Sequence, residues 1–239
     1  MGIVSALGAE ARHLGPTAQL GSGLESPADG ALLVISGMGS AAAALAARAL
    51  VDAGVTALAG WGMAGALDPA LRAGTVLLPS QVISREGAVF PTSRYWRQRL
   101  MPAIAAHCPV TCGKLLTSPR AIGSTAEKAA AFRETGAAAV DMESLAVAEV
   151  AKAHGLPFIV VRAIVDTAAD ALPRAVTEAA NSAGQLQIWS LIGKLARAPG
   201  DLASLVRLTR RYRAANRSLA AVGRAGGVVP HAFPIEPDP

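Results

Sequence analysis

Short apolar runs alternate with amphipathic or alanine-rich segments along most of the chain. The apolar runs predict seven strands, near residues 2–7, 31–36, 55–59, 75–83, 115–118, 137–140 and 158–165. The segments between them predict helices over 41–53, 124–135 and 142–154. Strands that alternate with helices are typical of an α/β fold. We therefore expect a single α/β domain over residues 1–195, with a mixed, mostly parallel central sheet flanked by helices.

The regular pattern weakens in two places. Residues 84–113 hold three prolines and several arginines, and they are predicted to be irregular. After Asp170 the pattern predicts only a short helix over 188–195 and an amphipathic helix over 202–222. We expect residues 196–222 to form a basic helical extension of the domain. Residues 223–239 hold four prolines and are expected to be a flexible tail.

Composition excludes several classes of protein. A hydrophobic content of 52% with 16% charged residues argues against disorder. No stretch of about 18 residues is free of charge and turn formers, so no membrane-spanning helix is predicted. No basic region precedes an apolar one at the N-terminus, so no secretory signal is expected. Cys108 and Cys112 are too few for a disulfide framework or a zinc site. These features are typical of a cytoplasmic protein.

The net charge of +5 is concentrated near the C-terminus. Residues 194–224 contain eight basic residues and a single acidic one, Asp201. One interpretation is that the helix over 202–222 packs on the domain and keeps a solvated basic face. The other is that this helix contacts an anionic bilayer surface. No nucleic-acid partner is predicted.

Three carboxylates follow the ends of two predicted strands. Asp141 and Glu143 come after the strand at 137–140, and Asp166 comes after the strand at 158–165. The carboxyl ends of parallel strands form one rim of a sheet, where ligands bind. Glu143 and Asp166 are therefore expected to face one crevice. The alternative is that Asp141 caps a helix and Asp166 caps a turn.

Two glycine-rich segments follow other predicted strands. Gly37-Met38-Gly39-Ser40 opens the helix over 41–53, so its backbone N–H groups predict a site for an anion or a hydroxyl group. Gly60 to Gly65 matches G-x-G-x-x-G and predicts a turn. That turn either lets the backbone near Gly62 and Met63 approach a small ligand, or is purely structural. Dinucleotide binding is a weaker interpretation of both segments.

Four motifs together resemble the superfamily of purine nucleoside phosphorylases and methylthioadenosine/S-adenosylhomocysteine nucleosidases. They are G-I-V-S-A-L-G-A-E at 2–10, S-G-M-G at 36–39, G-W-G-M-A-G-A-L at 60–67, and V-D-M-E-S-L-A followed by V-V-R-A-I-V-D within 140–166. The resemblance covers residues 1–195 and is greatest for the hopanoid-associated phosphorylase branch. It implies a nucleoside phosphorylase-like catalytic domain, a homodimer, and no metal or redox cofactor. Inorganic phosphate is implied only as a candidate co-substrate.

The resemblance also assigns roles to individual residues. Asp166 matches the acid that protonates the purine at N7, and Glu10 matches the base that activates water. Gly39 and Ser40 match the place where phosphate or the attacking water binds. The remaining positions match residues that bind substrate, namely Glu143 and Met142 at the ribose, Ile122 at the base, and Asp141, Gly62 and Met63.

The implied function is cleavage of the N-glycosidic bond of a purine nucleoside. In the hopanoid-associated branch the substrate is adenosylhopane, a lipid-linked nucleoside from which adenine is released by phosphorolysis or hydrolysis. One alternative is a nucleosidase acting on small soluble substrates such as methylthioadenosine, and another is a nucleotide-binding protein without this chemistry. Met63 stands where family members often have a hydroxyl residue. The arginine that would bind phosphate is not singled out among Arg12, Arg85, Arg120 and Arg162, so the nucleophile stays open.

Overall fold

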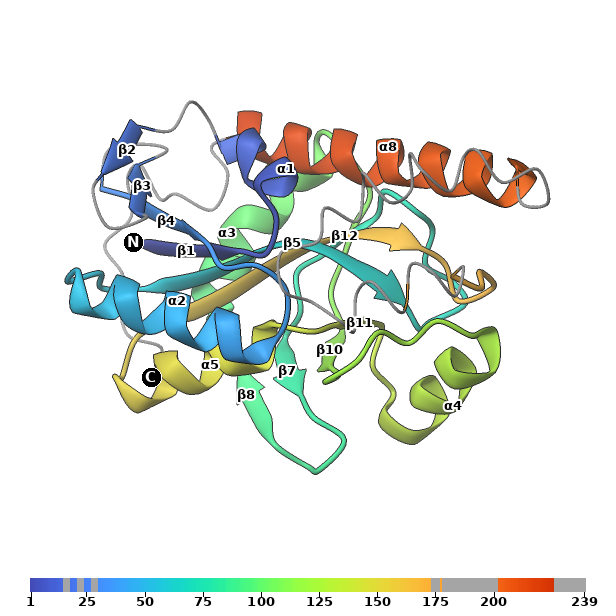
Figure 1. Ribbon diagram of the computed structural model, residues 1–239, viewed down its shortest axis with the longest axis horizontal. Coiled ribbons are helices and arrows are strands. Elements are labelled where there is room, and N and C mark those ends of the chain that lie inside the picture. The colour runs from blue at the N-terminus through green and yellow to red at the C-terminus, as the bar shows by residue number, and fades with distance from the viewer. Residues whose placement is uncertain (15–17, 21–23, 27–29, 173–176, 178–201, 226–239) are drawn as a thin grey trace.

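The structure, a computed structural model, describes residues 1–14, 18–20, 24–26, 30–172, 177 and 202–225. In this part of the chain a mixed, twisted sheet lies between helices, as the hydrophobic pattern predicts (Figure 1). The fold is a single α/β domain. No helix among the described residues has the length and apolar character needed to cross a membrane.

The long strand β5 (Leu58–Ala66) is the central strand of the sheet. It pairs in parallel with β1 (Gly2–Ser5) on one side and with β12 (Phe158–Asp166) on the other. The outer strands on the β1 side are β4 (Leu32–Ile35), β3 (Leu24–Ser26) and β2 (Ala18–Leu20). The strands beyond the end of β5 are β11 (Ala139–Asp141), β10 (Lys114–Thr117), β7 (Gln81–Ile83) and β8 (Val89–Pro91). The short strand β6 (Val76–Leu77) pairs with β12, and β9 (Val110–Thr111) pairs with β6.

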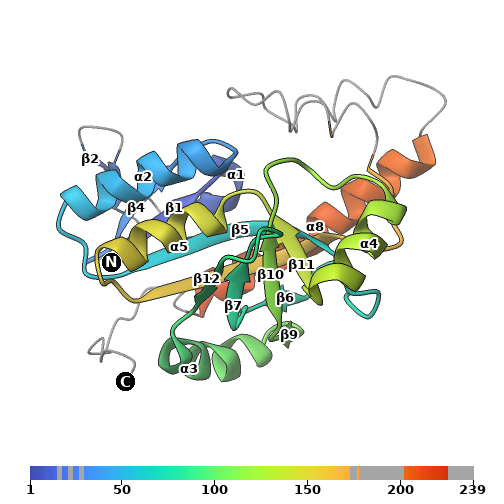
Figure 2. The same ribbon diagram turned by 90° about the horizontal axis from the view of Figure 1, so that it is seen from below.

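A hydrophobic core lies on each face of the sheet. On one face α2 (Ser40–Asp52) and α5 (Ser144–Ala153) pack side by side, and they bury Leu50 and Val147 (Figure 2). The other face is covered by α8 (Leu202–Arg224) and α3 (Arg94–Ala105). Alternate residues of β12 enter the two cores: Val160 and Ile164 the first, and Ile159, Val161 and Ala163 the second. The prediction that this strand is buried on both faces is confirmed.

Two short helical elements near the N-terminus and the helix α4 complete the fold. After β1 the chain forms α1 (Gly8–Ala11) and the 3-10 turn η1 (Arg12–Leu14). Helix α4 (Thr125–Thr135) begins at the N-cap Ser124, whose side chain forms a capping box with Glu127. Gly136 ends α4 in the left-handed conformation, which glycine adopts at no steric cost.

The predicted turn at Gly60 to Gly65 is wrong, because all of these residues belong to β5. In a strand with paired neighbours on both sides, glycines make room for side chains that cross above the backbone. The assumption that the strands near 137–140 and 158–165 run parallel to each other is also wrong. Both β11 and β12 pair with β5, but β11 runs antiparallel to it and β12 runs parallel.

The segment 84–113, predicted to be irregular, contains β8, α3 and β9. Helix α3 forms in spite of Pro102, because Ser93 caps its N-terminus and its apolar side chains Trp96 and Ile104 are buried. Burial of apolar side chains therefore outweighs the low helix propensity that the prolines give this segment.

The C-terminal helix α8 packs against the domain along its second half. Ala215, Leu219 and Val222 are buried in the second core. Ser218 donates a hydrogen bond of 2.6 Å to the carbonyl of Gly74. The outward face carries exposed arginines, namely Arg207, Arg210, Arg213, Arg217 and Arg224. The helix predicted over 188–195 and residues 226–239 of the predicted tail lie outside the described residues, and the domain boundary at 195 stays a prediction.

Candidate active site

Glu10 is held over the middle of β5. It follows β1 in the short helix α1, and its side chain is only 6% exposed. The N–H of Met63 donates to Glu10 Oε1 at 3.2 Å, and Trp61 Nε1 donates to the Glu10 backbone carbonyl at 2.9 Å. Trp61 and Met63, two residues of the glycine motif, thus fix the position of Glu10 through hydrogen bonds.

Gly62 lets two charged groups approach the same point of β5. A Cβ atom built on Gly62 would lie 2.6 Å from Glu10 Oε2 and 2.9 Å from Arg162 Nη1. A Cβ atom does not come that close to a nonbonded atom without displacement. The residue after Trp61 therefore has to be glycine for Glu10 and Arg162 to converge.

Arg162 organises the carboxylates beside β12. Its guanidinium donates through Nε to Asp141 Oδ2 at 2.9 Å and through Nη2 to Ser144 Oγ at 3.0 Å. Asp141 also accepts from Thr117 Oγ1 at 2.7 Å. Since both oxygens of Asp141 have partners within the protein, its carboxylate is positioned to hold Arg162.

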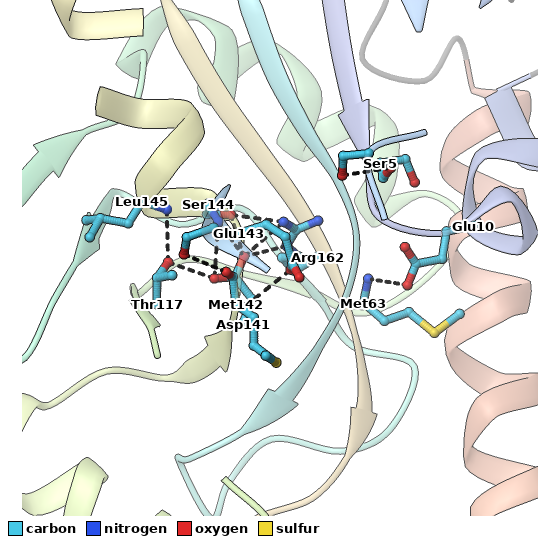
Figure 3. A network of polar contacts seen from close by, with 12 residues as sticks. Ser5, Glu10, Met63, Thr117, Asp141, Met142, Glu143, Ser144, Leu145 and Arg162 are labelled. Carbon is cyan, nitrogen blue, oxygen red and sulfur yellow. Dashed lines mark hydrogen bonds and ion pairs between the residues drawn. The ribbon is translucent and has the colours of Figure 1, made fainter. Parts of the chain in front are cut away.

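Glu143 lies at the N-terminus of α2 as well as at the start of α5. Its Oε1 accepts from the Gly39 N–H at 2.9 Å, and its Oε2 accepts from the Met142 N–H at 3.3 Å. Ser40 Oγ donates to the Met142 carbonyl at 2.9 Å. Figure 3 shows Asp141, Glu143, Ser144 and Arg162 turned toward one another. The G-M-G-S turn and the D-M-E motif, far apart in sequence, thus form one contact.

The Arg162 cluster, which we define as Arg162 with Glu10, Asp141 and Glu143, has an excess of carboxylates. Among the described residues, three buried acids surround one guanidinium. Burial raises the pKa of Glu10 to about 8, because Arg162 compensates only part of the desolvation and Glu143 adds repulsion. Burial and the neighbouring Asp141 raise the pKa of Glu143. A group of this kind attracts a proton or a developing positive charge.

Asp166 has a different environment at the end of β12. It forms a buried ion pair with Lys128 of α4, whose side chain is fully buried. Burial raises the pKa of Asp166, and the Lys128 ammonium opposes this change. A register shift between Ile164 and Asp166 sets the carboxylate above Gly65 of β5, where a Cβ would lie 3.1 Å from Oδ2.

The structure thus brings most of the predicted site residues to β5 and its neighbours. Ile122 is an exception, because its buried side chain packs into a hydrophobic cluster with Leu67 and Leu116. Of the arginines considered for phosphate, Arg85 and Arg120 form surface ion pairs with Glu134 and Glu127.

Sequence reasoning missed the roles of Arg162, Lys128, Thr117 and Ser144. Arg162 carried a usable signal, since it is a charged residue inside an otherwise apolar strand run. Lys128 carried none, because a lysine in an amphipathic helix is ordinarily solvated. In the described part of the chain, no group of three or more His, Cys, Asp or Glu side chains is arranged to hold a metal ion.

Comparisons with known proteins agree with this architecture. A family model described as the phosphorylase superfamily matches residues 27–192. No curated protein matches the chain. Futalosine hydrolase of Helicobacter pylori superposes with a TM-score of 0.65 at 17% identity, over 90% of this chain and 95% of that one.

Two nucleosidase structures give similar values. The 5′-methylthioadenosine/S-adenosylhomocysteine nucleosidase of Neisseria meningitidis, in complex with methylthio-immucillin-A, has a TM-score of 0.66 at 16% identity, over 93% of this chain and 98% of that one. The corresponding nucleosidase of Campylobacter jejuni has a TM-score of 0.65 at 16% identity over the same shares. At these identities the likeness shows a shared fold.

Proposed function

The chain belongs to the phosphorylase superfamily, and from this premise we propose that it cleaves the N-glycosidic bond of a purine nucleoside. It is an enzyme of the nucleosidase or nucleoside phosphorylase class. The structures it superposes on include a hydrolase of futalosine and nucleosidases of 5′-methylthioadenosine and S-adenosylhomocysteine, which supports a purine nucleoside as substrate.

The excess of carboxylates in the Arg162 cluster is the observation that carries this proposal. When an N-glycosidic bond breaks, the sugar passes through an oxocarbenium-like state with positive charge at C1′. Buried carboxylates fixed before the reaction stabilise such a charge strongly, because no solvent has to reorganise. We assign Glu143, with Met142, to the ribose, and Glu10 to the side from which the nucleophile attacks. Asp141 is assigned to hold Arg162, and Gly62 and Met63 to hold Glu10.

Asp166 is assigned to the leaving group. The electron pair of the C1′–N9 bond moves into the purine ring, and N7 gains a proton from the Asp166 carboxyl group. A neutral purine leaves poorly without that proton, and general-acid catalysis contributes about 100- to 10,000-fold to such steps. No metal or redox cofactor takes part in the proposed reaction.

Water is the better proposal for the nucleophile. The Gly39 N–H, which the sequence assigns to phosphate or water, donates to the Glu143 carboxylate at 2.9 Å. Ser40 donates to the Met142 carbonyl, and Arg162 is engaged by Asp141. A phosphate there would be repelled by Glu143. Water needs only a base, and Glu10 in its ionised form, which predominates above its pKa of about 8, can take the proton as the C1′–O bond forms.

The proposed substrate is adenosylhopane, in which the 5′ substituent is bulky and apolar. The resemblance to the hopanoid-associated branch supports it, as does the position of α8. Tyr212 of this helix is close enough to Glu10 to be affected by its charge, so α8 borders the proposed site. A small substrate such as methylthioadenosine is the alternative.

Product analysis tests the function and the nucleophile together. Purified protein is incubated with adenosylhopane or methylthioadenosine, with and without inorganic phosphate, and adenine and the sugar product are quantified. We expect adenine release without phosphate, loss of release in Asp166→Asn, and normal release in the control Asp52→Asn, an exposed carboxylate at the end of α2. NAD(P) binding without any base release would favour the non-catalytic alternative instead.

Peripheral membrane contact would bring a lipid-linked substrate to the enzyme, and it is proposed for the exposed face of α8. Deleting the helix would remove core residues such as Leu219, so substitution is the better test. Arg210→Glu with Arg213→Glu should reduce pelleting with phosphatidylserine vesicles. Unchanged pelleting would remove this proposal. The homodimer implied by the resemblance stays a prediction, which sedimentation would test.

A further inference from the structure

Lys128 is a buried charged residue that the proposed reaction leaves without a role. It lies on the inner face of α4. Its neighbour Glu127, by contrast, completes the capping box and forms an ion pair with Arg120 at the surface. The Lys128 side chain is 0% exposed. Burial of an ammonium group is costly unless every N–H finds a partner, so the position of this lysine requires an explanation.

All three N–H groups of Lys128 have acceptors at the end of β12. One donates to Asp166 Oδ2, and the others donate to the carbonyl groups of Thr167 and Asp170, each at 2.9 Å. An ammonium group has three donors, so this arrangement saturates it. Lys128 therefore contacts the proposed acid directly and also fixes the turn that follows it.

The carboxylate of Asp166 is anchored at one of its two oxygens. Oδ2 is engaged by Lys128, while the whole carboxylate lies over Gly65, with Oδ1 3.2 Å from the place of a Cβ. Glycine at this position keeps room for the carboxylate beside the strand. One oxygen is thus anchored by a cation, and Oδ1 is left as the oxygen that can exchange a proton with a base.

We propose that Lys128 is the positioning residue of the acid: it anchors Asp166 through Oδ2, so that Oδ1 meets N7 of the purine. This inference rests on the proposed function of Asp166. Lys128 also sets the proton affinity of Asp166, because its positive charge offsets the effect of burial. Neither the turn nor the capping of α4 requires a cation in contact with this carboxylate.

The other charged groups facing Asp166 provide the matched control. Among the described residues they are Asp170, in the turn after β12, and Arg211 of α8, which forms an ion pair with Asp170. Arg211 contacts the same turn as Lys128 and also lowers the proton affinity of Asp166, but less than Lys128 does. Arg211→Met therefore loosens the turn without releasing Oδ2.

The test compares Lys128→Met, Lys128→Arg and Arg211→Met in the full-length protein. In Lys128→Met we expect kcat for adenine release to fall about 100-fold, the lower end of a general-acid contribution, with a smaller change in KM. The limb of the pH profile that reports Asp166 should move up by about one pH unit or more. Lys128→Arg should recover part of kcat, and Arg211→Met should shift the limb less than Lys128→Met does.

A carbon-13 titration of the Asp166 carboxyl group, assigned with Asp166→Asn, gives the same comparison without substrate. An unchanged Asp166 titration in folded Lys128→Met, or an equal shift in Arg211→Met, would overturn the inference. A wild-type protein that releases no purine would overturn the proposed function instead, while the titration would still decide whether Lys128 governs Asp166.

Discussion

The two groups of buried acids in this protein differ in how their charge is compensated. In the Arg162 cluster, three carboxylates share one guanidinium among the described residues. At the end of β12, Asp166 has its own ammonium from Lys128. In the first group the carboxyl groups outnumber the cation, whereas in the second one carboxyl group has one cation. We infer that the first is suited to stabilise a cationic sugar, and the second to hold one acid in a fixed direction.

Removing the shared cation should have the largest effect on stability. In Arg162→Met three buried carboxylates lose their compensating charge, so we expect a loss of about 3–5 kcal/mol in the free energy of unfolding, measured with urea. The loss should be larger at pH 8 than at pH 5, where Glu10 holds its proton. Lys128→Met, which leaves one carboxylate, should lose less. Equal losses would remove the distinction between the two groups.

The pH dependence of stability should identify Glu10 as a member of the cluster. Its pKa is about 8 in the folded protein against 4.5 for the ordinary group. The unfolded chain therefore loses this proton at a lower pH than the folded protein does. The free energy of unfolding then falls as the pH rises from about 4.5 to 8, by at most about 1.4 kcal/mol per pH unit. Glu10→Gln should match wild type at pH 4 and exceed it at pH 8 in thermal unfolding.

Glu127→Gln is the control for that measurement. The hydrogen bonds from Arg120 and Ser124 lower the pKa of this exposed carboxyl group to about 2. Its ionised form contributes stability above about pH 4.5, and that contribution is lost as the pH falls toward 2. Glu10→Gln should thus exceed wild type in stability, by a difference that grows from about pH 4.5 to 8. Glu127→Gln should instead fall below wild type, by a difference that grows from about pH 2 to 4.5. A Glu10→Gln profile parallel to wild type would mean that Glu10 is not buried against like charge.

Gly62→Ala tests whether the close approach of Glu10 and Arg162 requires glycine. The new methyl group would overlap both side chains, so we expect a loss of about 1–3 kcal/mol in unfolding free energy and reduced activity. Gly60→Ala is the steric control on the same strand, since its Cβ would have no neighbour closer than 3.6 Å. Gly62 also has a positive φ of 155°, which by itself adds strain to an alanine there. Similar losses in both variants would show that strand geometry, rather than the charged groups, demands glycine.

The smallest effect is expected where an ion pair is exposed. Arg120 and Glu127 form such a pair on α4, with side chains 59% and 37% exposed. Because water screens the pair, Arg120→Gln should cost less than about 1 kcal/mol. A larger loss in chemical denaturation would mean that the pair supports the burial of Lys128 on the same helix.

Sequence patterns were sufficient for most of the fold because burial on both faces leaves a plain apolar signature. The strand over 158–165 and the helix over 124–135 were predicted within a residue or two. The glycine motif was misplaced, because a turn and a strand crossed by charged side chains both require glycine. What made Gly62 necessary, the approach of Glu10 and Arg162, depends on residues distant in sequence.

The motifs identified several residues of the candidate site, but they did not reveal how these residues contact one another. Glu143 and Gly39 were both singled out, but the sequence gives no sign that the carboxylate accepts from that N–H. The argument that placed Asp166 at a common rim assumed parallel neighbours, and β11 is antiparallel to β5. The partner of Asp166 was invisible, since burial of Lys128 follows from tertiary packing alone.

The most direct test is a structure of the protein with a nucleoside analogue whose glycosidic bond cannot be cleaved. We expect one bound molecule with its ribose hydroxyls against Glu143 and its purine N7 against Oδ1 of Asp166. An analogue that contacts only one of these carboxylates, or that binds away from β5, would contradict the claim that the two groups of acids act on one bond.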